Sequence, residues 1–600
     1  MLLVLTLICL SGYMYAANRW LKIDLAHTPL FCLSLIGLLL YFNALAGSLQ
    51  KGTAILIFTG MVLSLFWIPV AIRRWRDKGR RFLSGMFILF SVLVGLAFIL
   101  TWQMKFTVID DYVYWGIIGK YLYLNNHLPD VGNPLDVRIL AYTPGTGLLH
   151  YFFYLLVGKY SEHISYFAQS VFLISCLFVV VEKARLRRSI VYLGGLSLFL
   201  ILFYGSVFTK LQVDYLLAIL VFSIFWIYRS PSDYYIRILT VSAPVCFLFL
   251  IKQIGFFLGI FVLVTMAADL WFGQQAGKRE KIRSSLALAC VAAVLLLVRF
   301  LWNSHITAMG FVEFHNAVNA DSIKRALSIF TDPTVQRGFL LYIKGIFIGP
   351  ADRLNLPYLF WYGLVVFLWY NINKTLSRPE QRRLKVFTGL MAMVFCVYLI
   401  LLYFMQIILF NIGSAGHTVG LTRYLNIVFS EFVLIGLGVY FYKIVCRRYE
   451  IKTKAAVATA CVLIVVLGLS RFGVHNKRHP EDDRIQSLSQ KIQATLPASA
   501  QSVGILSRRH DNLPHLQFLY HLLPHRVDYN VRYIKTKEQM LGYIPQYDYL
   551  ILYEPESFLI DWVNPYMIDG DGAETIGLLK VNTGTSTGAE TLVLDKISLL

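Results

Sequence analysis

The sequence predicts a polytopic α-helical membrane protein with a small C-terminal α/β domain. Apolar runs of about 20 residues, the length of a helix that crosses a bilayer, recur through most of the 600-residue chain. Only 15% of the residues are charged and the mean hydropathy is +0.61, whereas soluble domains carry about 25% charged residues. We expect a transmembrane domain over residues 1–471 and a soluble domain over residues 472–600.

About fourteen spans are expected, each an apolar run between more polar loops. The pair at 238–250 and 255–272 could be two short spans or one bent span. The runs are 1–17, 29–46, 53–72, 83–102, 164–181, 189–204, 213–227, 238–250, 255–272, 285–302, 356–370, 386–409, 425–442 and 455–469.

The distribution of charge predicts how the spans are oriented. The net charge of +21 could indicate nucleic-acid binding, but much of it lies in short loops between apolar runs, as the positive-inside rule predicts. With fourteen spans, five basic clusters fall on one side, which we take as cytoplasmic. The C-terminal domain is then expected to be extracytoplasmic, and no nucleic-acid partner is expected. The clusters lie within residues 73–81, 183–188, 278–283, 378–385 and 447–454.

Two adjacent carboxylates open the first large extracytoplasmic loop, residues 106–160. Asp110 and Asp111 follow an apolar span and precede a segment rich in Tyr and Trp, residues that favour the headgroup level of a membrane. A helix N-terminus favours the ionised form of such an acid, which can then act as a general base on an acceptor hydroxyl. The alternative is a helix cap followed by an interfacial aromatic belt.

A Gly-rich loop at the same face contains His417 and ends in Arg423 and Tyr424. Glycines permit close approach of the backbone to a ligand, and the guanidinium fork suits phosphate oxygens. We expect Arg423 and His417 to bind a phosphate. The alternative is an arginine that snorkels to the membrane surface from a flexible loop.

Lys252 and Gln253 lie between two apolar runs, near the outer face in the expected topology. Polar groups at such a depth are costly and often functional, so Lys252 is a second candidate for binding phosphate. The alternative is a plain connecting turn.

Three further polar residues are weaker candidates. Glu313 and His315 lie two residues apart in another outer loop, but no third metal ligand is evident nearby, so a solvated loop is the simpler interpretation. Asp214 opens a span and could be a second acid at the same membrane level or a helix N-cap.

The tail alternates strand-like and helix-like runs. Strand-like runs occur at 502–506, 548–553 and 591–594, and helix-like runs at 511–523 and 535–542. This alternation predicts a small α/β domain. No Gly-rich phosphate loop follows the first strand, so no nucleotide site is expected there.

Four short motifs, in their order along the chain, resemble those of the GT-C class of membrane glycosyltransferases. This class includes protein O-mannosyltransferases and the aminoarabinose transferase of lipid A. The resemblance covers roughly residues 1–469, with two departures: about three spans precede the one that leads to the acid pair, and Tyr-Thr-Pro replaces a stricter Tyr-Pro-Pro. The motifs are Asp110-Asp111, Tyr142-Thr143-Pro144, Lys252-Gln253-Ile254-Gly255 and Arg423-Tyr424, with Phe311-Val312-Glu313-Phe314-His315 as a fainter fifth.

The resemblance implies a sugar donor carried on a polyprenyl phosphate or diphosphate, and transfer at the outer face. Asp110 or Asp111 would take the proton of the acceptor hydroxyl, and configuration would invert in one displacement. Lys252 and Arg423 would stabilise charge on the departing phosphate. The residues expected to contact substrate are Tyr142, Gln253, Glu313, His315 and Tyr424.

The resemblance also indicates partners and location. The acceptor could be a glycan, a lipid or a protein, and membrane lipids surround the spans. Some members of the class use a divalent metal ion, which nothing in this sequence requires, and no other cofactor is expected. The absence of cysteines from the outer loops and the tail favours a bacterial inner membrane.

Three other classes share part of the pattern. An O-antigen polymerase or ligase also has many spans and outer arginines; essential outer arginines with a dispensable Asp110-Asp111 pair would favour it. A flippase or transporter often has internal repeats and ionisable residues at mid-membrane, whereas no repeat is evident here. A structural membrane protein whose tail binds a partner would not need polar motifs clustered on one face.

Overall fold

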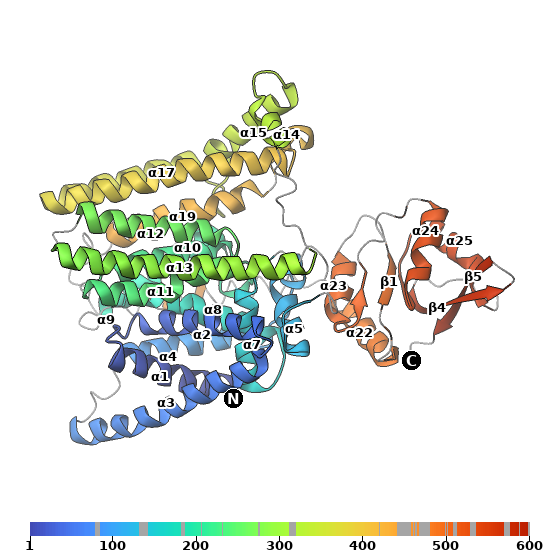
Figure 1. Cartoon of the computed structure of the whole chain (residues 1–600), viewed down its shortest axis with the longest axis horizontal. Coiled ribbons are helices and arrows are strands. Elements are labelled where there is room, and N and C mark those ends of the chain that lie inside the picture. Colours follow the sequence, from blue (N-terminus) through green and yellow to red (C-terminus); the bar gives the residue numbers. More distant parts are fainter. Residues whose placement is uncertain are drawn as a thin grey trace. The chain divides into compact units, whose positions relative to one another are not determined.

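The computed structural model divides the chain into two compact units (Figure 1). The membrane unit consists of residues 1–104 and 141–473, and the C-terminal unit of residues 105–140 and 474–600. The C-terminal unit thus includes residues 105–140, which the expected boundary after residue 471 leaves in the membrane domain. The structure describes residues 1–78, 85–130, 142–181, 186–205, 207–230, 232–273, 277–310, 320–418, 420–440, 458–459, 461–462, 465–466, 480–497, 500, 502–507, 513–528, 534, 536–568, 576–586 and 589–597.

The membrane unit is helical, and its helices lie roughly alongside one another in Figure 1. Within the described residues, nine helices are long and apolar enough to cross a membrane, which confirms the polytopic helical class. The expected span at 455–469 lies mostly outside the described residues. The nine are α1 (Leu2–Trp20), α2 (Thr28–Leu45), α3 (Leu49–Lys78), α9 (Leu186–Tyr204), α11 (Tyr234–Ile251), α12 (Gly255–Ala268, continued by η5, Asp269–Gly273), α13 (Lys278–Ala308), α17 (Arg378–Ile408) and α19 (Leu421–Tyr440).

Shorter helices complete the membrane unit. Three of them are apolar: α4 (Gly85–Thr101), α7 (Gly145–Val157) and α10 (Asp214–Tyr228). The apolar run at the end of the first outer loop is α7, whose side chains are almost all buried against α2, α8 and other helices. The others are α8 (Glu162–Phe178), η4 (Val207–Thr209), α14 (Ala320–Leu327), α15 (Pro333–Ile348), α16 (Tyr358–Thr375) and α18 (Ile412–Ala415).

Helix α10 lies at the centre of the membrane unit. Nearly all of its side chains are buried, and it packs against α8, α11, α12 and α19. A helix that is apolar on every side is expected in such a position. Asp214, its first residue, is therefore held inside the protein.

Helices α11 and α12 are separate elements, so the expected pair at 238–250 and 255–272 forms two spans and not one bent span. Helix α11 ends at Ile251, and Lys252 has an extended backbone, with φ −163° and ψ 147°. The chain turns over the next two residues and resumes as α12 at Gly255. Lys252 is therefore placed at a helix end.

The C-terminal unit is built around a mixed five-stranded sheet of order β2-β1-β3-β4-β5. Strand β1 pairs in parallel with β2 and β3, and β3, β4 and β5 pair antiparallel. The elements are η2 (Asp111–Trp115), α5 (Gly116–Asn125), α22 (Pro480–Thr495), β1 (Ser502–Ser507), α23 (Leu513–His521), β2 (Arg526–Val527), α24 (Lys537–Tyr543), η9 (Ile544–Gln546), β3 (Tyr549–Tyr553), α25 (Ser557–Val563), η10 (Asn564–Tyr566), β4 (Ile576–Ser586) and β5 (Ala589–Ile597).

This sheet confirms the predicted α/β class and adds elements that the sequence analysis does not contain. Strands β1, β3 and β5 correspond to the three strand-like runs, and α23 and α24 to the two helix-like runs. Strand β2 has only two residues, too few to show a strand pattern. Strand β4 pairs with β5 as a hairpin at the edge of the sheet.

Residues 105–125 are held to the C-terminal unit by specific contacts. Lys105 Nζ donates to Gln486 Oε1 at 3.2 Å. Lys120 Nζ donates to the Tyr520 carbonyl at 2.6 Å and lies 4.6 Å from the centre of its ring. The Tyr520 ring also lies 5.3 Å from that of Tyr112. The segment that carries the acid pair thus packs on α22 and α23.

Candidate functional site

Three charged side chains from three helices meet at one place in the membrane unit. Lys252 Nζ donates to Asp214 Oδ1 at 2.5 Å, and Arg423 Nε donates to Asp214 Oδ2. Asp214 begins α10, Lys252 follows α11, and Arg423 lies in the first turn of α19. The structure therefore brings together the two cations that the sequence predicts as phosphate ligands, and adds an acid between them.

The acid is far more buried than the two cations. The exposed fraction of the side chain is 3% for Asp214, 12% for Lys252 and 29% for Arg423. A buried carboxylate is stable only when paired and hydrogen bonded, and removing its partners is strongly destabilising. The two cations keep part of their surface exposed, Arg423 more than Lys252.

The segment before α10 is fixed by hydrogen bonds from α8 and α10. Gln169 Nε2 donates to the carbonyl of Lys210 at 3.0 Å. The Tyr215 hydroxyl lies 2.7 Å from the Val207 carbonyl and 2.8 Å from that of Lys210, within hydrogen-bonding distance of both. These contacts fix the main chain that leads into Asp214.

The start of α19 is fixed in the same way by side chains from neighbouring helices. The Tyr358 hydroxyl donates to Asn426 Oδ1 at 2.6 Å, and Asn426 Nδ2 donates to the Ala351 carbonyl at 2.9 Å. The Tyr398 hydroxyl donates to the Tyr424 carbonyl at 2.7 Å. These contacts hold the turn that carries Arg423.

Two glycines let the helix ends approach closely around Lys252. A Cβ on Gly255 would lie 1.9 Å from the Leu248 carbonyl oxygen, and a Cβ on Gly145 would lie 2.4 Å from the Leu250 carbonyl oxygen. Both distances are far inside van der Waals contact. The segment after Tyr142-Thr143-Pro144 therefore packs directly against the end of α11, next to Lys252.

Four other residues of the membrane unit that are predicted to contact substrate or phosphate differ in how exposed their side chains are. Tyr142, Gln253 and Tyr424 are half-buried. Lys252 Nζ lies 5.1 Å from the centre of the Tyr424 ring, a cation–π distance. His417 is exposed, and its Nδ1 lies 3.0 Å from the Ala415 carbonyl oxygen. Glu313 and His315 lie outside the described residues.

The acid pair belongs to the C-terminal unit and is described within it. Asp111 is buried, with 1% of its surface exposed, whereas Asp110 is half-buried. Asp111 opens the π-helical turn η2, and its backbone N–H donates to the Val108 carbonyl at 2.9 Å. Single π-helical turns are frequent at functional sites.

A stripe of polar atoms without partners lies on α7 and the residues before it. Thr143 Oγ1, Thr146 Oγ1 and both ring nitrogens of His150 are buried and have no hydrogen-bond partner among the described residues. Gln169 Oε1, on the neighbouring α8, is in the same state. Thr146 and His150, four residues apart, share one face of α7, and Thr143 precedes the helix, which begins at Gly145.

The sequence analysis treats Asp214 as a weak candidate and does not identify Glu431. Asp214 is not the N-cap of α10, which is Val213, and its carboxylate pairs with two cations. Glu431 lies on α19 two turns after Arg423, is fully buried, and has no hydrogen-bond partner among the described residues for either oxygen. An acid inside an apolar span was the available signal.

A metal centre finds no support in the described part of the chain. Within it, no group of three His, Cys, Asp or Glu side chains lies close enough to hold a metal ion. A structural or catalytic metal usually needs at least three protein ligands.

Comparison with known proteins gives a distant structural similarity. No family model and no curated protein matches the chain. It is similar to the crystal structure of ArnT from Cupriavidus metallidurans bound to undecaprenyl phosphate, with 12% identity and a TM-score of 0.46. For the apo state of ArnT the values are 13% and 0.37, and each match covers 85% of this chain and 98% of ArnT. At these TM-scores the similarity supports no conclusion about function.

Proposed function

We propose that this protein is a membrane glycosyltransferase whose sugar donor is carried on a polyprenyl phosphate. The observation that supports this most is the convergence of Lys252 and Arg423, from helices far apart in the sequence, on Asp214. Two partly accessible cations at the ends of apolar helices suit the phosphate of a lipid whose tail lies in the membrane. The resemblance of the four sequence motifs to the GT-C class points the same way.

The proposed reaction is a single displacement at the anomeric carbon of the donor sugar. Asp110 or Asp111 takes the proton from the acceptor hydroxyl, whose oxygen forms the new bond to that carbon. The bond from the anomeric carbon to the phosphate oxygen breaks, and polyprenyl phosphate leaves with both electrons of the bond. Lys252 and Arg423 stabilise the negative charge that develops on this phosphate. Configuration at the anomeric carbon inverts.

Asp214 has a positioning role in this proposal. Its carboxylate holds Lys252 and Arg423 in one orientation, so the cations need little reorganisation when a phosphate binds. His417 adds to the phosphate site, and Tyr142, Gln253 and Tyr424 contact the donor or acceptor. Glu313 and His315 are proposed substrate contacts on the sequence pattern alone.

The proposed location is the bacterial inner membrane, with the C-terminal unit on the extracytoplasmic side. The acceptor, a glycan, lipid or protein, would meet the donor at that face. The charge distribution of the loops supports this orientation. Tags placed after Leu600 and within residues 73–81 should report opposite sides of the membrane, and labelling from the same side would contradict this orientation.

Binding of undecaprenyl phosphate to the purified full-length protein tests the phosphate site. Native mass spectrometry should show binding to the wild type, and at least tenfold weaker binding to Lys252→Gln and to Arg423→Gln. Lys344→Gln, an exposed lysine on α15, is the control and should bind as the wild type does. Wild-type binding by both site variants would contradict the proposal.

The acid pair is tested separately from donor binding. Asp110→Asn and Asp111→Asn should bind undecaprenyl phosphate normally, and at least one of them should lose sugar transfer from a donor in membrane lipid extract. Two variants with wild-type transfer would remove the proposed base. They would favour a polymerase or ligase with essential outer arginines instead.

A lipid flippase is the second candidate, because Glu431 is an acid inside a span that has no hydrogen-bond partner among the residues the structure describes. Ionisable residues at such positions often mark transport pathways. Reconstituted vesicles distinguish the two functions. Movement of a lipid-linked sugar between leaflets without transfer to an acceptor would favour the flippase.

A further inference from the structure

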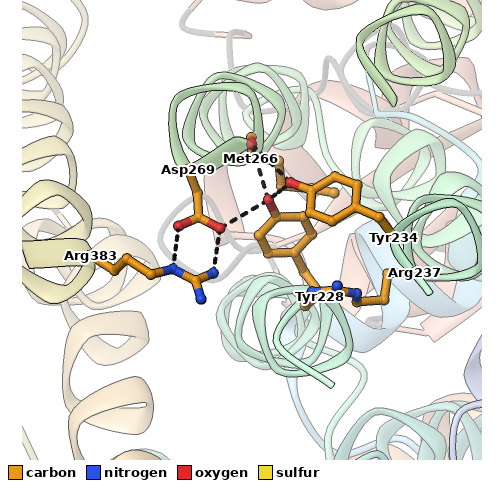
Figure 2. A network of polar contacts seen from close by, with 6 residues as sticks. All are labelled: Tyr228, Tyr234, Arg237, Met266, Asp269 and Arg383. Atoms are coloured by element: carbon orange, nitrogen blue, oxygen red, sulfur yellow. Dashed lines mark hydrogen bonds and ion pairs between the residues drawn. The ribbon is translucent and has the colours of Figure 1, made fainter. Parts of the chain in front are cut away.

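The ends of α10 and α11 away from Asp214 and Lys252 carry a second polar network, shown in Figure 2. Arg383 Nε and Nη2 donate to the two oxygens of Asp269 at 3.1 and 2.9 Å. The Tyr228 hydroxyl donates to Asp269 Oδ2 at 3.1 Å and also contacts the Tyr234 hydroxyl. The network ties the end of α10 and the start of α11 to η5 and α17.

The side chain of Arg237 lies beside Tyr228 and Tyr234, and this network does not neutralise its positive charge. Its Nη1 donates to the Tyr228 carbonyl at 3.1 Å, and its guanidinium lies 4.7 Å from the centre of the Tyr234 ring. Its Nε is buried and has no hydrogen-bond partner among the described residues. Asp269 already accepts two hydrogen bonds from Arg383, so it is not a full counter-ion for Arg237.

Three more cations lie around the same helix ends. Arg229 directly follows α10 and is exposed. Arg283 lies 4.6 Å from the centre of the Tyr235 ring, and Lys281 Nζ lies 5.8 Å from that of Trp271. Within the described residues, none of these three cations, nor Arg237, forms an ion pair with a carboxylate. We call Arg229, Arg237, Lys281 and Arg283 the basic face.

The surrounding helix ends carry a clear excess of positive charge. Segments 228–238, 269–273, 277–283 and 377–385 contain ten cations and four carboxylates. The cations are Arg229, Arg237, Lys278, Arg279, Lys281, Arg283, Arg378, Arg382, Arg383 and Lys385, and the acids are Asp233, Asp269, Glu280 and Glu380. Glu380 accepts hydrogen bonds from Ser377 as a helix cap.

Exposed aromatic side chains place the basic face at the level of the lipid headgroups. Tyr235, Trp271 and Phe272 have 46%, 49% and 70% of their surface exposed, so these rings face the surroundings of the protein and not its core. Aromatic rings concentrate at the boundary between lipid tails and water. Cations at this depth lie beside the phosphates of the adjacent leaflet.

We propose that the basic face binds the headgroup phosphate of an anionic phospholipid in this leaflet. Basic pockets between membrane helices are suited to anionic headgroups, and each arginine or lysine near the surface strengthens such binding. The Arg383–Asp269 pair and the two tyrosines fix the helix ends that present the cations. The lipid site is at the opposite end of α10 and α11 from the proposed donor site and does not depend on it.

Native mass spectrometry of the full-length protein tests this site. The protein is exposed to equal amounts of phosphatidylglycerol and phosphatidylcholine, and the retained lipids are counted for Arg229→Gln/Arg283→Gln and for the wild type. Lys324→Gln/Lys344→Gln removes two exposed charges from α14 and α15 and is the matched control. Thermal unfolding of each variant verifies that it is folded.

We expect the wild type and the control to retain phosphatidylglycerol in preference to phosphatidylcholine. This preference should weaken about fivefold for each arginine that is removed from the basic face. Equal retention of the two lipids by the wild type would overturn the proposal. So would a double variant of the basic face that retains phosphatidylglycerol as the control does. Displacement of the lipid by millimolar inorganic phosphate would show a general anion site and would also overturn it.

Discussion

Lys252 Nζ lies 2.5 Å from Asp214 Oδ1, although the two residues belong to different helices and Asp214 is almost fully buried. Arg423 approaches the other carboxylate oxygen from a third helix. This contact fixes both the chemistry and the stability of the site, since the charges compensate one another inside the protein.

Replacing Asp214 by Asn should destabilise the protein by about 3 kcal/mol, because it leaves two partly buried cations without a counter-ion. Thermal unfolding of the purified protein in detergent measures the change as a lower Tm. Asp233→Asn, an exposed acid that precedes α11, is the control and should unfold as the wild type does. Equal Tm values for Asp214→Asn and the control would show that the ion pairs contribute nothing.

Replacing Glu431 by Leu should have the opposite effect. A buried carboxyl group without hydrogen-bond partners destabilises the folded state by about 1–3 kcal/mol, and leucine removes that group at similar volume. We expect a higher Tm for Glu431→Leu and an intermediate value for Glu431→Gln. A lower Tm for the leucine variant would show that Glu431 has a partner, such as water or a ligand, in the membrane.

Gly255, which begins α12 after the turn at Lys252, should tolerate no side chain. Gly255→Ala places a Cβ 1.9 Å from the Leu248 carbonyl oxygen, so the turn must shift, and we expect both lower stability and weaker binding of undecaprenyl phosphate. Gly363→Ala on α16 is the matched control, because nothing lies within 4 Å of its Cβ. There alanine should be neutral or stabilising by up to about 1 kcal/mol. Equal behaviour of the two variants would contradict the close packing.

Removing the Tyr520 ring should loosen the acid-pair segment. The ring packs against Phe106 at 5.4 Å and Tyr112 at 5.3 Å between ring centres, and beneath Lys120 Nζ. Hydrogen–deuterium exchange of Tyr520→Ala should therefore be faster over residues 106–125 than in the wild type. Tyr549→Ala, on β3 of the sheet, serves as the control within the same unit. Unchanged exchange in Tyr520→Ala would show that other contacts hold the segment.

Local sequence patterns predicted the elements well but not their long-range contacts. Lys252 and Arg423 were identified because cations stand out at the ends of apolar runs. The resemblance to the GT-C class implies that both act on one phosphate, but their pairing with Asp214 is not evident from the sequence, since Arg423 and Asp214 are 209 residues apart and no local period links them. For the same reason the packing of residues 105–125 on α22 and α23 was not expected.

The helices α10 and α11 end in polar contacts at both membrane faces. At one end Asp214 binds Lys252, and at the other Tyr228 contacts Asp269 and Tyr234. Pro244 lies within α11 between these ends. Proline has no backbone N–H to donate, so the helix lacks one hydrogen bond there and bends more easily. Residues 243–251, which include the proline and the half of α11 after it, are nevertheless all buried, so packing against neighbouring helices keeps this half of the helix, and with it Lys252, in place beside Asp214.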